Sequence, residues 1–444
     1  MRCAVIGATG YVGVRLVARL LDEGHEVAAL VRDADKLAAT GWADRVDVVP
    51  GDLTDHASLR TLTAGATAVV HLAHALGQPD FPDRDRAAAH AVADAAADAG
   101  VRRLVYLGGL RPPASTPASR HLSSRAEVAE VFLAGPVPTA ALGASVVVGS
   151  GSASFEMIRY LAERVPVLPA LPWLAHRTQP VAIADVLHYV VGALALPPEV
   201  DRHFDIGGPD VLSYLELIRR YLRLAGLPQS ATVPLPVSVP AGGPAFAGRV
   251  VEALTPLSRQ LVTPLIESLG HDLVCVEQDV LTVIGPPPGG PTTYDAAVRA
   301  ALGRRRDGAD GDAGGSRAGD PCVVGPVDPA LPGPTDPAGS GGPAYRWSTV
   351  APCAAEAGAL WAVVDGLGGA AGWYAPPGAW TLRGWADQLL GGVGAYRGRP
   401  HGRALQVGDV VDGWRVDAVE PGARLRLRSE LRQPGRMWLE LGVA

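Results

Sequence analysis

Short apolar runs alternate with longer amphipathic stretches through the first 300 residues. The apolar runs have the length of buried strands, and the stretches between them repeat apolar residues at helical spacing. Alternating strands and helices form βαβ units, so the pattern predicts an α/β fold with a doubly wound parallel sheet. Strands are predicted at 2–8, 26–32, 46–53, 68–73, 102–109 and 139–149, with helices at 12–24 and 87–100.

The pattern changes after the sixth predicted strand. Residues 1–302 are expected to form one domain. Its first half is residues 1 to about 150, and a smaller lobe of about 151–302 lies on the C-terminal side of the sheet. Within this lobe, Asp185 is predicted to be a helix N-cap, and Ser213 with Glu216 to form a capping box. The lobe is predicted from the segments 154–165, 179–194, 202–208 and 213–226.

The last third of the chain has a different composition. Residues 303–344 are rich in Gly, Pro and Asp and predict a disordered linker between 1–302 and 345–444. In the final segment, one helical stretch is followed by runs that alternate apolar and polar residues, as half-buried antiparallel strands do. This predicts an α+β domain, with its helix at 359–369 and its strands at 405–420, 423–431 and 436–444.

Composition narrows the possible functions. A net charge of −6 offers no basic surface for nucleic acid. The four cysteines show no zinc-site spacing, and prolines interrupt the longest uncharged run, so neither a metal site nor a transmembrane segment is predicted. The N-terminus has no signal-peptide pattern, so we expect a cytoplasmic protein. The bias toward Ala, Arg, Gly and Pro suggests a bacterial, GC-rich genome.

The segment GATGYVG lies between the first predicted strand and the first predicted helix. Gly7 permits a tight turn, Gly10 lets the backbone approach a pyrophosphate, and Gly13 lets helix and strand pack closely. The helix N-terminus then offers free N–H groups to the phosphates. A Rossmann dinucleotide site is therefore predicted, rather than a merely structural turn, with contacts from Gly7, Thr9, Gly10, Tyr11, Val12 and Gly13.

The ends of the next strands are expected to complete this site. Arg32 follows the second strand, where an arginine suits the 2′-phosphate of NADP and an acidic residue suits the 2′-hydroxyl of NAD. We therefore favour NADP(H) over NAD(H), although the adjacent Asp33 keeps NAD(H) open. Asp52 and Leu53 are expected to flank the adenine. At the end of the fourth strand, further contacts are predicted from His71, Leu72 and Ala73, although His71 also fits a packing role.

These segments resemble the short-chain dehydrogenase/reductase superfamily. Besides GATGYVG, the matching segments are GDLTD, VYLGG, QPVAIADV and FDIGGPDVLSY, which fit its extended and atypical, NmrA-like branches. The resemblance covers residues 1 to about 300. It implies a Rossmann fold, a bound nicotinamide cofactor and redox chemistry.

The chain departs from that superfamily at the catalytic dyad. Active members carry a Tyr four residues before a Lys; the Tyr exchanges a proton, and the Lys lowers its pKa and holds the ribose. Lys36 is the only lysine here, so no such pair exists. His121 and Arg125 keep the spacing, and Gly108 and Gly109 stand where a Ser is expected; Gly108 is also expected to contact the cofactor. His121 could donate a proton and Arg125 could hold a ribose; alternatively, they are a loop cap and a surface charge.

Two functions fit this combination. We expect first an NADP(H)-dependent oxidoreductase with a carbonyl or lipophilic, quinone-like acceptor, since a quinone can take its protons from water. The alternative is a redox sensor or assembly factor that binds NADPH without turnover. Neither the oligomeric state nor the substrate follows from the sequence.

The C-terminal block resembles the DUF2867 family, through GGAAGWY, LQVGDVVDGWRV and LRLRSELRQPGRMWLEL. That family is similar to the START-like helix-grip fold, which encloses an apolar cavity and ends in further strand and a long helix. Since this sequence stops at Ala444 after a strand, the domain is expected to be truncated or incomplete.

This resemblance adds a third possible function, lipid or polyketide handling. An aromatic set would line a cavity or form an ordinary core: Trp361, Trp373, Tyr374, Trp380 and Trp385. Arg383, Arg397 and Arg399 could form an anion site, against which stands the simpler interpretation of ordinary surface charge.

Overall fold

A computed structural model gives the structure of the chain. It describes residues 1–32, 37, 40, 42–75, 80–111, 118–164, 167–169, 172–227, 229, 231–233, 267–302, 349–374, 380, 383–384, 387, 393–395, 397–399, 404–431 and 437–443. The predicted linker at 303–344 lies outside the described residues.

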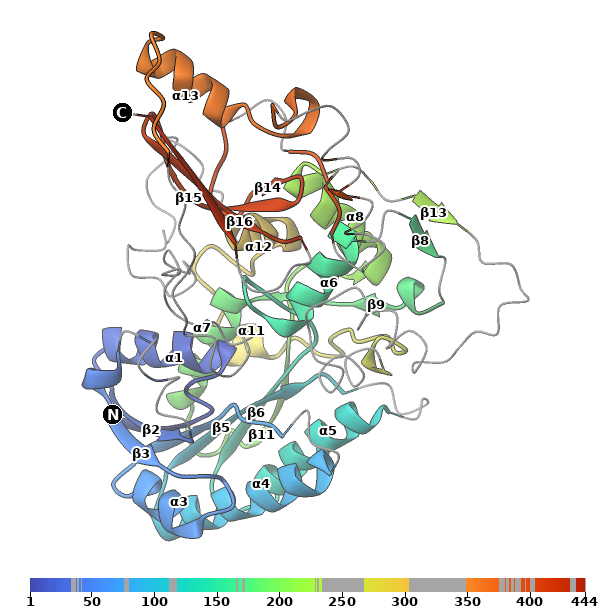
Figure 1. The fold of residues 1–444 in the computed structure, drawn as a ribbon. Coiled ribbons are helices and arrows are strands. Elements are labelled where there is room, and N and C mark those ends of the chain that lie inside the picture. The colour runs from blue at the N-terminus through green and yellow to red at the C-terminus, as the bar shows by residue number, and fades with distance from the viewer. Residues whose placement is uncertain are drawn as a thin grey trace.

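A seven-stranded parallel sheet forms the centre of the first domain (Figure 1). Its strands are β1 (Arg2–Ile6), β2 (Glu26–Val31), β3 (Asp47–Pro50), β4 (Ala68–His71), β5 (Arg103–Gly109), β6 (Thr139–Ala144) and β11 (Arg202–Ile206). The spatial order is β11-β6-β5-β4-β1-β2-β3, with all pairs parallel. The predicted doubly wound Rossmann sheet is confirmed, and the strand order reverses between β1 and β4, where such sheets bind ligands.

Helices cover both faces of this sheet. On one face lie α1 (Tyr11–Asp22) and α7 (Ile183–Leu194), and on the other lie α3 (His56–Thr63), α4 (Phe81–Asp98) and α5 (Arg120–Leu133). The strands are apolar toward both layers, as burial on two sides requires. Leu16 and Tyr189 pack on the first face, and Leu59 and Phe132 on the second, each with almost no exposed surface.

Residues 202–208 correct one prediction. The sequence places them in the smaller lobe, but β11 pairs with β6 from Arg202 to Ile206 and extends the main sheet. The helix before it, α7, likewise packs on the sheet beside α1. Both segments return to the sheet because their apolar residues, such as Phe204 and Val186, are buried against strand residues rather than against the lobe.

The lobe beyond the sheet is built around the helix pair α6 (Ala153–Arg164) and α8 (Tyr214–Ala225), with α12 (Tyr294–Ala301) beside them. Phe155 and Tyr221 meet edge to face, with ring centroids 5.9 Å apart. The small elements around this core are β7 (Val147–Val148), β8 (Val167–Pro169), η2 (Pro172–Ala175), β9 (Arg177–Thr178), β10 (Val181–Ala182), β12 (Leu212–Ser213) and β13 (Ala231–Val233). The short helix α11 (Val280–Val283) packs beside β11, against the sheet core. One more short element, η1 (Ala43–Arg45), precedes β3.

Two predicted helix starts have different outcomes. Ser213 and Glu216 form the expected capping box at the start of α8. Asp185 is not an N-cap, because α7 is capped at Ala182. The Asp185 carboxylate instead accepts hydrogen bonds from the backbone N–H of Thr292, at 2.7 Å, and from its hydroxyl, at 2.8 Å. It therefore ties α7 to the segment that leads into α12.

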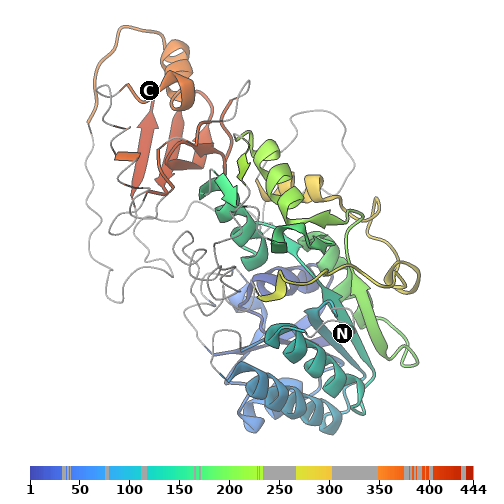
Figure 2. The same ribbon diagram turned by 90° about the vertical axis from the view of Figure 1, so that its right-hand side faces the viewer.

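The C-terminal segment forms a separate antiparallel unit. Its elements are α13 (Ala357–Asp365), η3 (Gly369–Ala371), β14 (Val410–Val411), β15 (Trp414–Glu420), β16 (Arg424–Ser429) and β17 (Trp438–Gly442). The four strands pair in chain order, which confirms the predicted α+β domain. Figures 1 and 2 show this domain beside the lobe helices rather than beside the parallel sheet. Across the described ranges, no helix has both the length and the apolar surface needed to cross a bilayer.

Candidate functional site

The glycine loop joins β1 to α1 in the conformation that the sequence predicts. Gly7 has a φ of +86°, and a Cβ there would lie 2.9 Å from the backbone nitrogen of Ala73. A Cβ on Gly13 would lie 2.1 Å from the carbonyl oxygen of Gly7, so any side chain would push the helix off the loop. These contacts hold the loop between β1 and β4, at the point where the strand order reverses.

The first turn of α1 is available to an anion. Its N-cap is Gly10, which offers no side chain to the free N–H groups, and the first turn contains no acidic residue. A Cβ added to Gly10 would have one described atom within 4 Å, the Gly7 carbonyl oxygen, so there is open space on the outer side of the turn. The donor set thus fits a pyrophosphate, with Thr9 part-exposed in the same turn. Tyr11 and Val12 instead pack their side chains partly against the core.

The loop is also fixed from the lobe side. The guanidinium of Arg15 lies 4.1 Å from the ring centroid of Tyr11 and donates to the carbonyl oxygens of Tyr11 and Ser150. A Cβ on Gly149 would lie 2.1 Å from the Tyr11 hydroxyl, so the turn after β7 closes directly over this ring.

Arg32 lies at the end of β2, as predicted, and 77% of its side-chain surface is exposed. Its guanidinium is 3.6 Å from a carboxylate oxygen of Asp52, which follows β3. The other Asp52 oxygen accepts from the backbone N–H and hydroxyl of Thr54. Desolvation opposes ionisation of Asp52, but the hydrogen bonds of Thr54 and the charge of Arg32 outweigh it and lower its pKa. Asp33 and Lys36 lie outside the described residues, and Leu53 packs partly against the core.

At the end of β4, the backbone faces the glycine loop, whereas the side chain of His71 points into the core. The backbone of Leu72 and Ala73 lies against Gly7, and their contact with a cofactor remains a prediction. His71 points the other way: its ring is 3% exposed and lies 5.2 Å from the ring centroid of Phe132. Burial, and then the charge of Arg125, lower the pKa of His71 to about 3. Its imidazole is a neutral packing group beneath the sheet, and the prediction of a cofactor contact is limited to its backbone.

The Tyr106 side chain occupies the space that the side chain of the expected serine would need at Gly108. A Cβ on Gly108 would lie 2.7 Å from the Tyr106 ring and 3.1 Å from its hydroxyl. Tyr106 is 1% exposed, and its hydroxyl donates to the backbone carbonyl of Arg125 at 3.3 Å. Gly108 is therefore the residue that admits Tyr106 into the core, and a serine there would collide with the ring.

Arg125 is buried, not the surface charge of the alternative interpretation. It is 9% exposed, and one of its N–H groups donates to the Tyr106 hydroxyl at 3.4 Å. Within the described part of the chain, no carboxylate lies within ion-pair distance of this guanidinium. A buried cation with one long neutral hydrogen bond retains donors for a further polar group.

Asp85, in α4, binds both the loop after β4 and α5, a role that no motif indicated. Its carboxylate accepts from the backbone N–H of Ala75 at 2.7 Å and from the Ser124 hydroxyl at 3.3 Å. The residue is 7% exposed. Desolvation raises the pKa of Asp85 and outweighs these hydrogen bonds and the nearby charge of Arg125.

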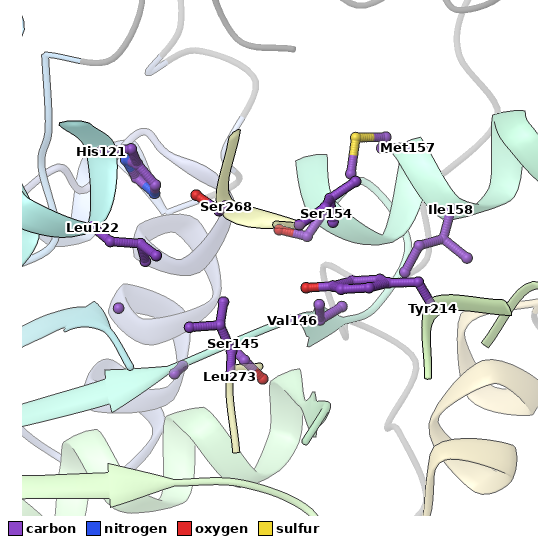
Figure 3. A pocket seen from close by; sticks show the side chains of 13 residues that line it. His121, Leu122, Ser145, Val146, Ser154, Met157, Ile158, Tyr214, Ser268 and Leu273 are labelled. Atoms are coloured by element: carbon purple, nitrogen blue, oxygen red, sulfur yellow. The ribbon is translucent and has the colours of Figure 1, made fainter. Parts of the chain in front are cut away.

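A pocket lies where β5 and β6 end, and His121 forms part of its wall (Figure 3). The Nδ1 atom of His121 is buried and has no hydrogen-bond partner among the described residues. Burial, with the charge of Arg125, lowers the pKa of His121 to about 3. The imidazole is thus neutral at neutral pH, contrary to the ordinary pKa on which its predicted role as a proton donor depended.

The other pocket walls come from the lobe. Figure 3 shows the Tyr214 hydroxyl, from the first residue of α8, directed into the pocket toward the side that holds His121 and Ser268. Burial raises the pKa of Tyr214 to about 12, so this hydroxyl stays protonated. Among the described residues, no lysine, arginine, aspartate or glutamate contributes to the walls, which are lined by Gly109, His121, Leu122, Ala144, Ser145, Val146, Ser154, Met157, Ile158, Tyr214, Ser268, Leu269 and Leu273.

Sequence reasoning did not find Tyr214 as a pocket residue. It follows a strand and opens an amphipathic helix, so the pattern indicates only a buried core position. The available signal was its place directly after Ser213 in a capping box, which fixes the direction of the first helical side chains. Such a signal cannot say that the hydroxyl meets the end of a strand 70 residues earlier.

The aromatic residues of the C-terminal domain pack on one another. The Trp373 ring centroid lies 5.6 Å from that of Trp380 and 5.8 Å from that of Trp414. Trp361 joins the same core, Tyr374 is 71% exposed, and Trp385 lies outside the described residues. Trp361, Trp373 and Trp380 therefore belong to the core of this domain, whereas Tyr374 lies at its surface.

The three arginines considered for an anion site all have protein partners. Arg383 lies 3.5 Å from Asp387, and Arg399 donates to the carbonyl oxygens of Asp365 and Leu367. Arg397 is buried, with carboxylates of Glu163 and Glu430 at 2.7 and 2.8 Å. Nothing in this geometry favours an anion site, and Arg397 is not surface charge.

Two family models match the sequence. Residues 7–134 match the NAD(P)H-binding family, and residues 344–444 match the family described as protein of unknown function DUF2867. Residues 7–134 are thus similar to NAD(P)H-binding domains, and residues 344–444 are similar to DUF2867 domains. Both predicted resemblances are confirmed, and the glycine loop and the crevice at Ala73 lie within the first match.

Curated relatives cover different parts of the chain. An uncharacterised protein of Mycobacterium tuberculosis is 34% identical over 26% of this chain, and the match spans 12% of that protein. A ceramide reductase of Caulobacter vibrioides is 28% identical over 60% of this chain and 81% of its own length. Several of the relatives that this chain matches are named reductases.

Solved structures share the fold of the first domain. The NADPH-dependent quinone oxidoreductase QOR2 of Escherichia coli, complexed with NADPH, superposes with a TM-score of 0.53 over 68% of this chain and 100% of that chain. At 16% identity, the likeness concerns the fold alone.

Proposed function

We propose that the protein is an NADP(H)-dependent oxidoreductase that reduces a neutral, largely apolar molecule at a carbonyl or quinone oxygen. The observation that carries this proposal is the pocket at the ends of β5 and β6. It opens on the same edge of the parallel sheet as the glycine loop, and its described walls are apolar side chains, hydroxyls and the neutral imidazole of His121. A charged substrate would lose its hydration there without an ionic partner.

Three groups of the chain would hold the cofactor. The N-terminus of α1 offers backbone N–H groups to the pyrophosphate, and Arg32, exposed and only loosely paired, can turn to a 2′-phosphate. Arg125 keeps free N–H donors near the pocket and would take a ribose hydroxyl. Bound NADPH supplies a hydride to the substrate.

The Tyr214 hydroxyl is the residue that we assign to the substrate oxygen. When a carbonyl or quinone carbon accepts a hydride, negative charge develops on its oxygen, and a hydrogen-bond donor aimed at that oxygen stabilises the change. Tyr214 is protonated over the whole neutral range and points into the pocket. The remaining proton reaches the oxygen from this hydroxyl, which is then reprotonated, or from water at the pocket mouth.

Neutral His121 has a complementary role. Its Nδ1 has no hydrogen-bond partner among the described residues, and its side chain lines a pocket whose other polar side chains carry hydroxyls. A neutral imidazole can accept one hydrogen bond and donate another, so it can orient the substrate without changing charge. This differs from the titrating proton donor that the sequence suggested.

The test compares two buried tyrosines. Tyr214→Phe removes the pocket hydroxyl, and we expect kcat/KM for NADPH oxidation with menadione to fall roughly 10- to 100-fold, since a donor to a developing charge contributes about 1.5–3 kcal/mol. The matched control is Tyr189→Phe, in α7, because the Tyr189 hydroxyl is buried without a hydrogen-bond partner among the described residues and does not line the pocket.

NADPH affinity, followed by its fluorescence, is expected to stay within about twofold in both variants, because neither hydroxyl lies in the glycine loop. If Tyr214→Phe keeps full activity, the assignment of Tyr214 is wrong. Tight NADPH binding by the wild-type protein without oxidation by quinones or carbonyl compounds would favour the non-catalytic sensor instead.

A further inference from the structure

A buried cluster of four charges joins the C-terminal domain to the lobe. Glu163, in α6, has no exposed side-chain surface, and its carboxylate lies 2.7 Å from the guanidiniums of both Arg397 and Arg415. Both arginines also bind Glu430 of their own domain, at 2.8 and 2.7 Å. The cluster holds two carboxylates and two guanidiniums, so its charges balance.

The electrostatics of the cluster are consistent with a permanent contact. Desolvation opposes ionisation of Glu163 and Glu430, but the charges of Arg415 and Arg397 outweigh it and lower the pKa of each carboxyl group. Each arginine therefore faces an ionised partner on both sides. Undocking would leave Glu163 without these guanidiniums, and removing one partner of a buried ion pair is costly.

Apolar and backbone contacts extend the same interface. Val410, in β14, is 3% exposed and belongs to the lobe core that includes Tyr221 and Val298. A Cβ on Gly408 would lie 2.8 Å from the carbonyl oxygen of Leu302, at the end of α12, so the two backbones are in close contact there. The C-terminal domain is thus packed on the lobe by shape as well as by charge.

The two helices under this interface are the ones that wall the pocket. In α6, Ser154, Met157 and Ile158 line the pocket, and Glu163 follows about 7 Å further along the helix axis. In α8, Tyr214 lines the pocket, and the Tyr221 hydroxyl donates to Glu163 two turns later. One end of each helix shapes the substrate site while the other is held by the C-terminal domain.

We propose that the DUF2867 domain acts in cis as a brace for the substrate pocket: by binding the far ends of α6 and α8, it fixes the position of Tyr214 and of the apolar wall. Its interaction surface is the cluster of Glu163, Arg397, Arg415 and Glu430 with Val410, and its partner is the lobe of the same chain. The proposal rests on the proposed function for its kinetic consequence only, because the mechanical coupling is measurable without turnover.

The experiment uses the full-length protein and two Arg→Gln changes in the same sheet. Arg415→Gln breaks the contact with Glu163 from the C-terminal side, while Arg424→Gln breaks an exposed pair with Glu420. Hydrogen exchange by mass spectrometry is followed in peptides from α6, α8 and α1. We expect Arg415→Gln to speed exchange at least fivefold at 153–158 and 214–218, with α1 unchanged, and Arg424→Gln to have no effect there.

Kinetics give the second readout. Arg415→Gln is expected to raise the KM for menadione at least fivefold and to leave the Kd of NADPH within twofold, because the glycine loop does not touch this interface. Should Arg415→Gln not fold, Val410→Ala removes less and is expected to raise the same KM about threefold. Unchanged exchange at 153–158 and 214–218 in a variant whose C-terminal domain exchanges faster would overturn the brace, whereas absence of wild-type turnover would count against the proposed function alone.

Discussion

Two sites along one edge of the sheet, the glycine-loop site and the pocket site, differ in how closely they keep the expected residues. At β1 and β4, each glycine of the loop is held by a backbone contact, and the N-terminus of α1 is clear for phosphate. At β5 and α5, a glycine replaces the expected serine, a buried cation and a neutral imidazole replace the dyad, and the best-placed hydroxyl comes from α8. This chain therefore keeps the features expected for cofactor binding more closely than those expected for proton donation.

Substitution at the glycine-loop site is expected to have the largest effect on cofactor binding. In Gly13→Ala, the new methyl group would lie 2.1 Å from the Gly7 carbonyl oxygen, which is part of the backbone and cannot rotate away. We expect the Kd of NADPH, measured by fluorescence titration, to rise roughly 100-fold and the free energy of unfolding to fall by about 3 kcal/mol.

Gly358→Ala is the matched control for that change. Gly358 lies in α13, and a Cβ there would meet nothing within 4 Å, so the alanine is expected to leave NADPH binding unchanged. If Gly13→Ala binds NADPH like the wild-type protein, the loop is only a scaffold, and the contrast between the glycine-loop site and the pocket site disappears.

His71 is buried in the core, and we expect it to affect the pH dependence of stability rather than the reaction. Its pKa in the folded protein is about 3, below its ordinary value of about 6.5, so the unfolded chain binds the extra proton between these values. The stabilisation is present above pH 6.5 and is lost as the pH falls. Between pH 7 and 5, this residue is expected to lower the free energy of unfolding by about 2 kcal/mol.

Urea unfolding at both pH values checks this expectation. His71→Leu should lose about 2 kcal/mol less than the wild-type protein between pH 7 and 5, because the leucine does not titrate. His90→Leu, an exposed change in α4, should keep the wild-type difference. Equal pH dependence in His71→Leu and the wild-type protein would mean that His71 is not buried as a neutral ring.

Arg32 sharpens the choice of cofactor. Removing its guanidinium in Arg32→Ala is expected to weaken NADPH binding about tenfold, or 1.4 kcal/mol, and to leave NADH binding unchanged, because only NADPH carries the 2′-phosphate. Arg45→Ala, another exposed arginine, which lies 3.8 Å from Asp22, is the control. Equal losses for NADH and NADPH would assign Arg32 to general electrostatics and remove the argument for NADP(H).

The smallest effect on activity is expected at the pocket site, where His121 and Arg125 hold the positions of the usual dyad. Because the pKa of His121 is about 3, kcat/KM with menadione should show no His121 inflection between pH 5.5 and 8. A pH–rate profile of the wild-type protein and His121→Gln checks this. An inflection near pH 6.5 that His121→Gln abolishes would restore His121 as a titrating proton donor.

Most of the first domain could be predicted because local pattern decides it. The strands at β1, β2, β4 and β5 are continuous apolar runs, and GATGYVG is local in sequence, so strand, turn and helix follow from neighbouring residues. The place of β11 could not be predicted in this way. Its pairing with β6 depends on contacts with residues 62 positions earlier, such as Phe204 with Leu142.

The pocket and the domain interface were hidden for the same reason. Arg397 and Arg415 are ordinary charges in an arginine-rich sequence, and only the fold places them against Glu163, 234 and 252 residues away. Spacing within a helix relates His121 to Arg125, but burial, which sets the pKa of His121, is a tertiary property. Sequence alone therefore predicted the positions of the dyad residues better than their charge states.

The most direct test of the central claim is a single-turnover measurement. NADPH is bound to an excess of the wild-type protein, menadione is added, and absorbance at 340 nm is followed against free NADPH and against Gly13→Ala. We predict that protein-bound NADPH is oxidised faster than free NADPH, that Tyr214→Phe slows this phase, and that Gly13→Ala abolishes it. NADPH that stays bound and is oxidised no faster than in free solution would contradict the account and identify a protein that binds the cofactor without using it.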